Sequence, residues 1–141
     1  MEEIDQRIVE HLLDDGRMSF TDLGKAMGLS TSAVHQRVRR LEDRGVITGY
    51  TARVDHAELG RPLTAFMSIT ALDPAAPDDV PDRLRDIREI EGCFSVAGEE
   101  SYILQVRVGT PGELEELIAR VRAAANVTTR TTIVLSTPWE R

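Results

Sequence analysis

The sequence predicts an α+β protein whose helical first part is followed by a part in which strands and helices alternate. Two patterns support this division. Apolar residues recur at helical spacing between residues 4 and 41, whereas from Leu63 onward they alternate with a period of two. The 141 residues are enough for one ordinary domain or two small ones, each with a buried core.

Three helices are predicted in the first part of the chain. Apolar residues four positions apart, from Ile4 to Leu12, indicate a first helix that ends at an Asp-Asp-Gly run. Ser19 begins a capping box and opens a second helix. Gly28 allows a tight turn, after which Ser30 is the expected N-cap of a third helix.

The third helix is followed by a segment with a different composition. Val34, Val38 and Leu41 direct one face of the helix to the core, and Gly45 is placed to end it. Residues 46–54 are rich in β-forming side chains and predict a short strand pair, or wing. Three short helices, a tight turn between the last two and a wing describe a winged helix-turn-helix.

The outward face of the third helix carries the side chains that we expect to contact DNA. They are polar or basic: Thr31, Ser32, His35, Gln36, Arg39 and Arg40. Short polar side chains near the start of the helix reach base edges, and arginines pair with phosphates or with the guanine edge. The alternative is a solvated basic face on a structural helical hairpin. The spacing of turn, core and wing favours DNA contact.

The distribution of charge bears on this interpretation. The net charge of −7 argues at first sight against contact with nucleic acid or an anionic membrane. Residues 30–54, however, hold five arginines and two acidic residues, a net charge of +3. A basic patch on an acidic protein favours DNA contact more specifically than a basic overall composition would.

The second part of the chain begins after Gly60-Arg61-Pro62, the predicted domain boundary. Strands and helices are expected in the order β-α-β-β-α-β, with strands at residues 63–71, 91–97, 102–108 and 127–135. This order is the split, or ferredoxin-like, pattern. The predicted organisation is a helix-turn-helix domain over 1–54, a linker over 55–61 and a ferredoxin-like domain over 62–141.

One face of the predicted sheet is expected to meet a partner. Tyr102, Leu104, Val106 and Val108 point one way along the third strand, whereas Ile103, Gln105 and Arg107 point the other way, and the helices are expected to cover one of the two sides. A four-stranded sheet seldom leaves an apolar second face in water, so we expect a homodimer. Two recognition helices about one DNA turn apart would then read a pseudo-palindromic operator in double-stranded DNA.

Several short stretches mark a resemblance to a known family. Residues 28–34 read GLSTSAV, residues 37–42 read RVRRLE and residues 45–50 read GVITGY. With the opening IDQRI they resemble the Lrp/AsnC (feast/famine) family of transcriptional regulators, over about residues 3–137. The resemblance implies a sequence-specific DNA-binding regulator and homodimers that assemble further, often to octamers. It also implies a small effector, usually an amino acid, which binds between dimers near the turn joining the second and third strands.

Candidate effector-binding residues follow from this resemblance. They lie on that turn and on the last strand: Gly98, Glu99, Glu100, Ser101, Tyr102, Thr129 and Thr131. Gly98 allows close backbone approach, amide groups could hold a carboxylate, and Glu99 or Glu100 could pair with an ammonium group. Many members carry an aspartate where this chain has Ser101, so a glutamate substitutes for it or the ligand preference differs. The alternatives are a solvated turn and ordinary strand-forming threonines.

No catalytic, metal or cofactor site is predicted. The three histidines lack metal-ligand spacing, and the single cysteine, Cys93, is expected to be a buried thiol. No signal peptide or membrane-spanning run is evident, so we expect a cytoplasmic, nucleoid-associated protein.

Two other functions are alternatives to an effector-responsive regulator. The same architecture occurs in sirohaem decarboxylases, although the lack of any histidine after His56 counts against such an enzyme. The other alternative is an architectural DNA-binding protein without an effector.

Overall fold

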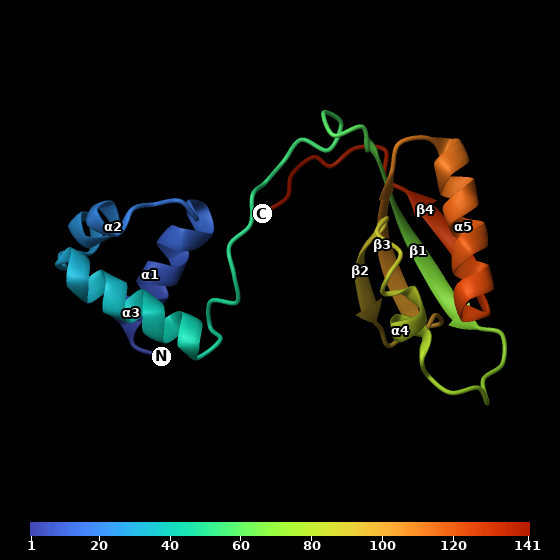
Figure 1. The fold of residues 1–141 in the computed structure, drawn as a ribbon, viewed down its shortest axis with the longest axis horizontal. Helices are drawn as coiled ribbons and strands as arrows, with labels where there is room; N and C mark the ends of the chain where they lie inside the picture. The colour runs from blue at the N-terminus through green and yellow to red at the C-terminus, as the bar shows by residue number, and fades with distance from the viewer. The chain divides into compact units, whose positions relative to one another are not determined.

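The three predicted helices are present and pack around a core of their own. A computed structural model describes all of residues 1–141, and the chain divides into two units, Met1–Arg53 and Val54–Arg141. In the first unit α1 spans Glu3–Asp14, α2 spans Phe20–Met27 and α3 spans Thr31–Asp43 (Figure 1). Their shared core consists of Ile8, Leu23, Met27, Val34, Val38 and Leu41.

Side-chain caps begin α2 and α3 as the sequence predicts. The Asp22 amide donates to Ser19 Oγ at 3.0 Å, and the Ala33 amide donates to Ser30 Oγ at 3.2 Å. Each bond satisfies a backbone donor that has no partner within the first turn of its helix. Between the two helices Gly28 adopts φ +70°, a left-handed conformation that glycine takes without strain.

The turn between α2 and α3 also depends on Gly24. A Cβ atom at this position would lie 2.6 Å from the carbonyl oxygen of Leu29, and that oxygen belongs to backbone. We expect Gly24→Ala to lower the stability of the first unit by about 1–3 kcal/mol, because the overlap outweighs alanine's better helix propensity. Thermal unfolding followed by circular dichroism checks this. Gly49→Ala is the control, since nothing lies within 4 Å of its Cβ position. Equal melting temperatures for the two variants would refute the expectation.

The predicted wing is absent, which corrects the winged helix-turn-helix interpretation. Residues 46–54 contain no strand, and Val46, Tyr50 and Val54 are exposed. The amides of Val46 and Ile47 donate to the carbonyl oxygen of Leu41 and so complete the end of α3. These residues have β-forming side chains but no strand to pair with, and strand propensity alone does not form a sheet.

The second unit has the predicted ferredoxin-like order. Its elements are β1 (Leu63–Ala71), α4 (Val80–Leu84), β2 (Ile90–Ser95), β3 (Tyr102–Val108), α5 (Pro111–Ala125) and β4 (Val127–Ile133). The strands pair antiparallel in the order β2-β3-β1-β4. Strand β2 begins one residue earlier and ends two residues earlier than predicted, and β4 ends two residues earlier.

Helices α4 and α5 cover one face of this sheet (Figure 1). The buried side chains between them and the strands include Met67, Leu104, Val106, Leu117 and Val121. The alternate residues of β3 from Tyr102 to Val108 lie on this covered face and are all buried. The opposite face carries alternate residues and is uncovered, with Phe66 and Phe94 exposed on it.

The predicted linker over 55–61 belongs to the second unit, where residues 56–60 form a turn with Gly60 at φ +73°. The domain limits that the sequence predicts stay a prediction. None of the helices combines the length and the apolarity that a membrane span requires.

Candidate functional site

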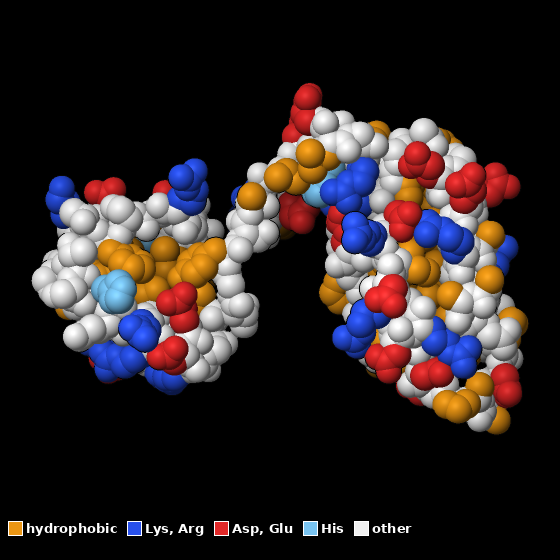
Figure 2. Space-filling model, viewed as in Figure 1, with side chains coloured by type: hydrophobic (Ala, Val, Ile, Leu, Met, Phe, Trp, Pro, Cys, Tyr) orange, Lys and Arg blue, Asp and Glu red, His pale blue; other side chains and the backbone are white.

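The residues predicted to contact DNA share one exposed face of α3. Val34, Val38 and Leu41 are buried on the other face, which fixes the rotation of the helix. The six predicted residues are all exposed: Thr31, Ser32, His35, Gln36, Arg39 and Arg40. Figure 2 shows basic side chains gathered at the α3 side of the first unit.

Side chains of α2 contact the first turns of α3 on this exposed face. The ring of His35 meets the ring of Phe20 edge-on, with centroids 5.4 Å apart. Thr31 Oγ1 lies 3.5 Å from Thr21 Oγ1. The side chains nearest the start of α3 are therefore held against the preceding helix.

Arg37 does not belong to the outward face, although it contributes to the positive charge counted in the sequence. Its Nη1 donates to Asp5 Oδ1 at 2.9 Å and to Glu2 Oε2 at 3.2 Å, both from the start of α1. The pKa of the Arg37 guanidinium is raised, chiefly by the hydrogen bond to Asp5. Arg39 and Arg40 form no ion pair within the chain, so they are the arginines of α3 whose charge is not offset by a neighbouring acid.

A cavity of about 490 Å³ lies at one end of the sheet in the second unit. The loop after β1, the turn between β2 and β3 and the start of β4 converge on it. Five predicted effector residues line it: Gly98, Glu99, Glu100, Ser101 and Tyr102. Its charged lining is entirely acidic: Asp73, Asp78, Glu99 and Glu100. This charge favours a ligand that carries an ammonium group.

A hydrogen bond crosses one side of this cavity. The hydroxyl of Tyr102 donates to Asp78 Oδ1 at 2.7 Å. This bond to Asp78 is the main cause that raises the pKa of the Tyr102 phenol, so the phenol stays protonated at neutral pH. The amide of Ser101 donates to the carbonyl of Ile69 at 3.0 Å and so has a partner within the sheet. The amides left to hold a ligand carboxylate are those earlier in the turn.

A second hollow of about 300 Å³ lies beside the cavity, on the uncovered face of the sheet. Arg130 Nη2 lies 4.0 Å from Glu100 Oε2 there, so it adds a cation at the edge of the acidic cavity. Thr129 also borders this hollow, but its hydroxyl accepts a hydrogen bond from Arg122 Nε of α5 at 3.0 Å. Thr131 lines neither space.

The turn that the sequence predicts as an effector site does line this cavity, and its role stays a prediction; Asp73, Asp78 and Arg130 were not among the predicted residues. The side of β4 that faces the helices can be predicted from the sequence. Val127, the apolar residue that begins the strand, marks this side, and Thr129 and Thr131 follow it at every second position. Arg130 takes the opposite parity and faces outward. No local signal could have found Asp78, because only the folded loop brings it to Tyr102.

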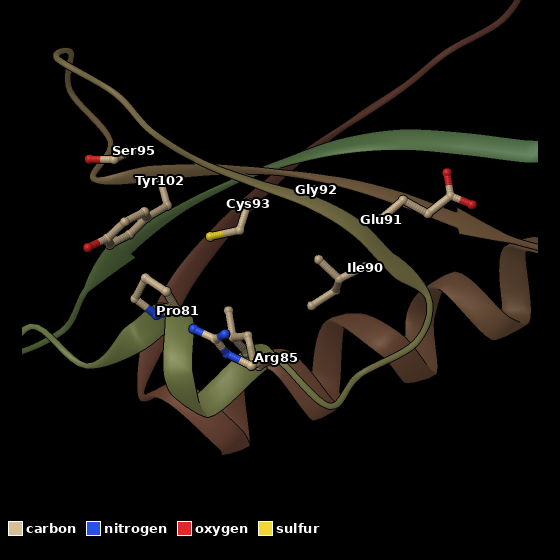
Figure 3. Close-up of a pocket in the computed structure, with 9 residues that line it drawn as sticks. Pro81, Arg85, Ile90, Glu91, Gly92, Cys93, Ser95 and Tyr102 are labelled. Atoms are coloured by element: carbon tan, nitrogen blue, oxygen red, sulfur yellow. The ribbon is translucent and has the colours of Figure 1, made fainter. Parts of the chain in front are cut away.

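A groove of about 400 Å³ adjoins the cavity between α4 and the edge strand β2 (Figure 3). Ile90 and Cys93 point from β2 toward the helix, and Tyr102 and Ser95 line both spaces. Cys93 is exposed, so the expectation of a buried thiol was wrong: β2 is an edge strand, and the short helix α4 does not cover it. Partial burial still raises the pKa of the Cys93 thiol.

Tyr102→Phe tests whether the hydrogen bond shapes the cavity. The substitution removes the hydroxyl that donates to Asp78. We expect effector affinity to fall about tenfold, because the Asp78 carboxylate is then no longer held in place at the cavity wall. Isothermal titration with the effector measures this. Tyr50→Phe removes the other tyrosine hydroxyl of the chain, in the first unit, and is the control. Equal effector affinity for the wild type and Tyr102→Phe would show that the bond is not needed.

Together these features define a two-part regulator class, with a helix-turn-helix unit followed by a ferredoxin-like unit that carries a ligand-sized cavity. The AsnC-type helix-turn-helix domain matches residues 1–42, and the Lrp/AsnC ligand binding domain matches residues 64–141. The chain belongs to the Lrp/AsnC family of transcriptional regulators.

Similar proteins agree with this assignment. The HTH-type transcriptional regulator LrpA of Mycobacterium tuberculosis is 53% identical over 137 residues, which cover 97% of this chain and 91% of the relative. The leucine-responsive regulatory protein of Escherichia coli is 35% identical, covering 96% and 85%. The relatives are named as transcriptional regulators, so the decarboxylase alternative is not favoured.

Solved structures share the fold over the whole chain. The feast or famine regulatory protein of M. tuberculosis complexed with L-methionine is 52% identical, with a TM-score of 0.97 and coverage of 99% and 95%. LrpC of Bacillus subtilis is 29% identical, with a TM-score of 0.89 and coverage of 100% and 99%.

Proposed function

We propose that this regulator binds operator DNA through α3 and that an amino acid held in the acidic cavity changes its DNA affinity. The observation that carries the proposal is the pairing of two features in one chain. One is the exposed polar and basic face of α3; the other is the acidic cavity at the end of the sheet. A similar protein of M. tuberculosis complexed with L-methionine supports an amino acid as the ligand class.

The roles of the cavity residues follow from their chemistry. Glu99 or Glu100 pairs with the α-ammonium group, a charge-assisted contact. Glu99 has no ion-pair partner within the chain, whereas Glu100 lies near Arg130. The ligand carboxylate is bound by backbone amides of the turn around Gly98, with Arg130 close enough to add a positive charge.

Dimerisation through the uncovered sheet face completes the proposed DNA-binding unit. Phe66 and Phe94 are 40% and 52% exposed on that face, with Ile103 paired opposite Phe94. A second copy of the same face would remove these apolar side chains from water. Two copies of α3 would then read a pseudo-palindromic operator, and further assembly, to an octamer, would bring the effector cavities of neighbouring dimers together. DNA binding would also place the chain on the nucleoid.

Thermal-shift screening with the common amino acids tests the effector half of the proposal. A ligand that binds only the native state raises the melting temperature, by an amount that grows with ligand concentration. We expect methionine or another amino acid to do so, and Glu99→Gln/Glu100→Gln to abolish the shift. If no amino acid raises the melting temperature while the chain still binds operator DNA, an effector-independent architectural protein becomes the better interpretation.

A further inference from the structure

Arg37 is the one arginine in the second half of α3 that faces another helix. Gln36 and Arg39, close to it in sequence, are exposed, yet its guanidinium is bonded to the first turn of α1 and its side chain is 22% exposed. We infer that Arg37, through Asp5, is the positioning residue of the recognition helix, holding α3 at the angle at which its outward face meets DNA. This inference rests on the proposed function of α3.

The burial of Asp5 explains why the contact is specific. Asp5 is the only buried charged residue of the chain, and its side chain is 11% exposed. A buried carboxylate is costly unless a charged partner and hydrogen bonds compensate it. Arg37 supplies both at 2.9 Å, so α1 and α3 can approach closely only while the pair is intact.

The pair also removes Arg37 from the charge available to DNA. Asp5 and Glu2 together offset its positive charge, with Glu2 Oε2 at 3.2 Å. Arg37 should therefore affect DNA binding without neutralising a phosphate. Loss of a phosphate contact lowers the slope of log affinity against log salt by about one, whereas loss of a positioning residue leaves that slope unchanged.

The experiment uses the full chain carrying R37Q, D5N or both, at a temperature at which circular dichroism shows each variant folded. Each single variant is expected to lower the melting temperature by about 5 °C or more. The ratio of operator to random-DNA affinity should fall about tenfold, with an unchanged salt slope. The melting temperature and the affinity ratio of the double variant should be no lower than those of the more affected single variant, because all three variants lose the same ion pair.

Two controls separate the possible outcomes. E3Q removes an acid from the same turn of α1 that forms no ion pair, and it should change neither the melting temperature nor the affinity ratio. R39Q removes a cation of the outward face that has no ion pair, and it should weaken operator binding without lowering the melting temperature. A lower melting temperature with an unchanged affinity ratio would make the pair merely structural. A lower salt slope for R37Q alone would make Arg37 a phosphate contact. Either result overturns the inference. If the unmodified chain does not bind DNA, the proposed function is overturned together with this inference. In that case the effects of R37Q and D5N on the melting temperature would still be non-additive, because the ion pair itself does not depend on DNA.

Discussion

Arg39→Ala is expected to weaken operator binding by about 1–3 kcal/mol, while Arg7→Ala leaves it nearly unchanged. Arg39 lies on the exposed face of α3 and has no ion-pair partner within the chain, so its guanidinium is free to meet a base edge or a phosphate. Arg7 carries the same charge and is exposed, but it lies on α1 and not on α3. Fluorescence anisotropy with labelled operator and with random DNA of equal length measures both variants.

The two DNAs distinguish the two roles of Arg39. A larger loss on the operator than on random DNA assigns the side chain to base recognition. An equal loss assigns it to phosphate, with a lower salt dependence. If both DNAs bind Arg39→Ala as tightly as the wild type, α3 is not the recognition helix.

Phe66→Glu is expected to have a still larger effect, because it acts on both half-sites at once. Phe66 lies on β1 in the uncovered face, paired opposite Gln105 and Thr132 on the neighbouring strands. A carboxylate there would be buried without a partner in the proposed dimer. We expect monomers, and a loss of operator affinity of about 100-fold or more, because linked binding to two half-sites is lost.

Sedimentation velocity, together with the same anisotropy assay, measures this effect. Leu72→Glu is the matched control: Leu72 is a more exposed apolar residue that follows the end of β1. It should leave both assembly and operator affinity unchanged. An undiminished oligomer for Phe66→Glu would place the interface on another surface.

Features set by local chemistry were predictable from the sequence. The caps at Ser19, Ser30 and Thr110 depend on side chains within three residues of the amides that they accept from. The alternation of β1 and β3 reported which face meets the helices, because buried strands carry apolar residues at every second position. These local rules were sufficient for the order of elements and for the rotation of α3.

Features set by distant contacts were not predictable in the same way. The prediction of a wing over 46–54 was wrong because the strand propensity of these residues does not supply a second strand for them to pair with. Arg37 counted as basic surface charge until the structure placed it against Asp5, 32 residues earlier in the chain. The cavity combines predictable and unpredictable features. The family resemblance pointed to the turn that lines it, but Asp78 is brought to Tyr102 by the fold alone, across 24 residues of sequence.

The central claim is that the cavity and α3 are coupled, and one titration tests it directly. Affinity for an operator selected from genomic fragments is measured with and without saturating methionine, or whichever amino acid raises the melting temperature most. Effector affinity is then measured with and without that operator. The account predicts that both affinities change by the same factor, about 5- to 150-fold, since coupling between two binding sites is reciprocal. An effector that binds tightly while neither affinity changes would contradict it.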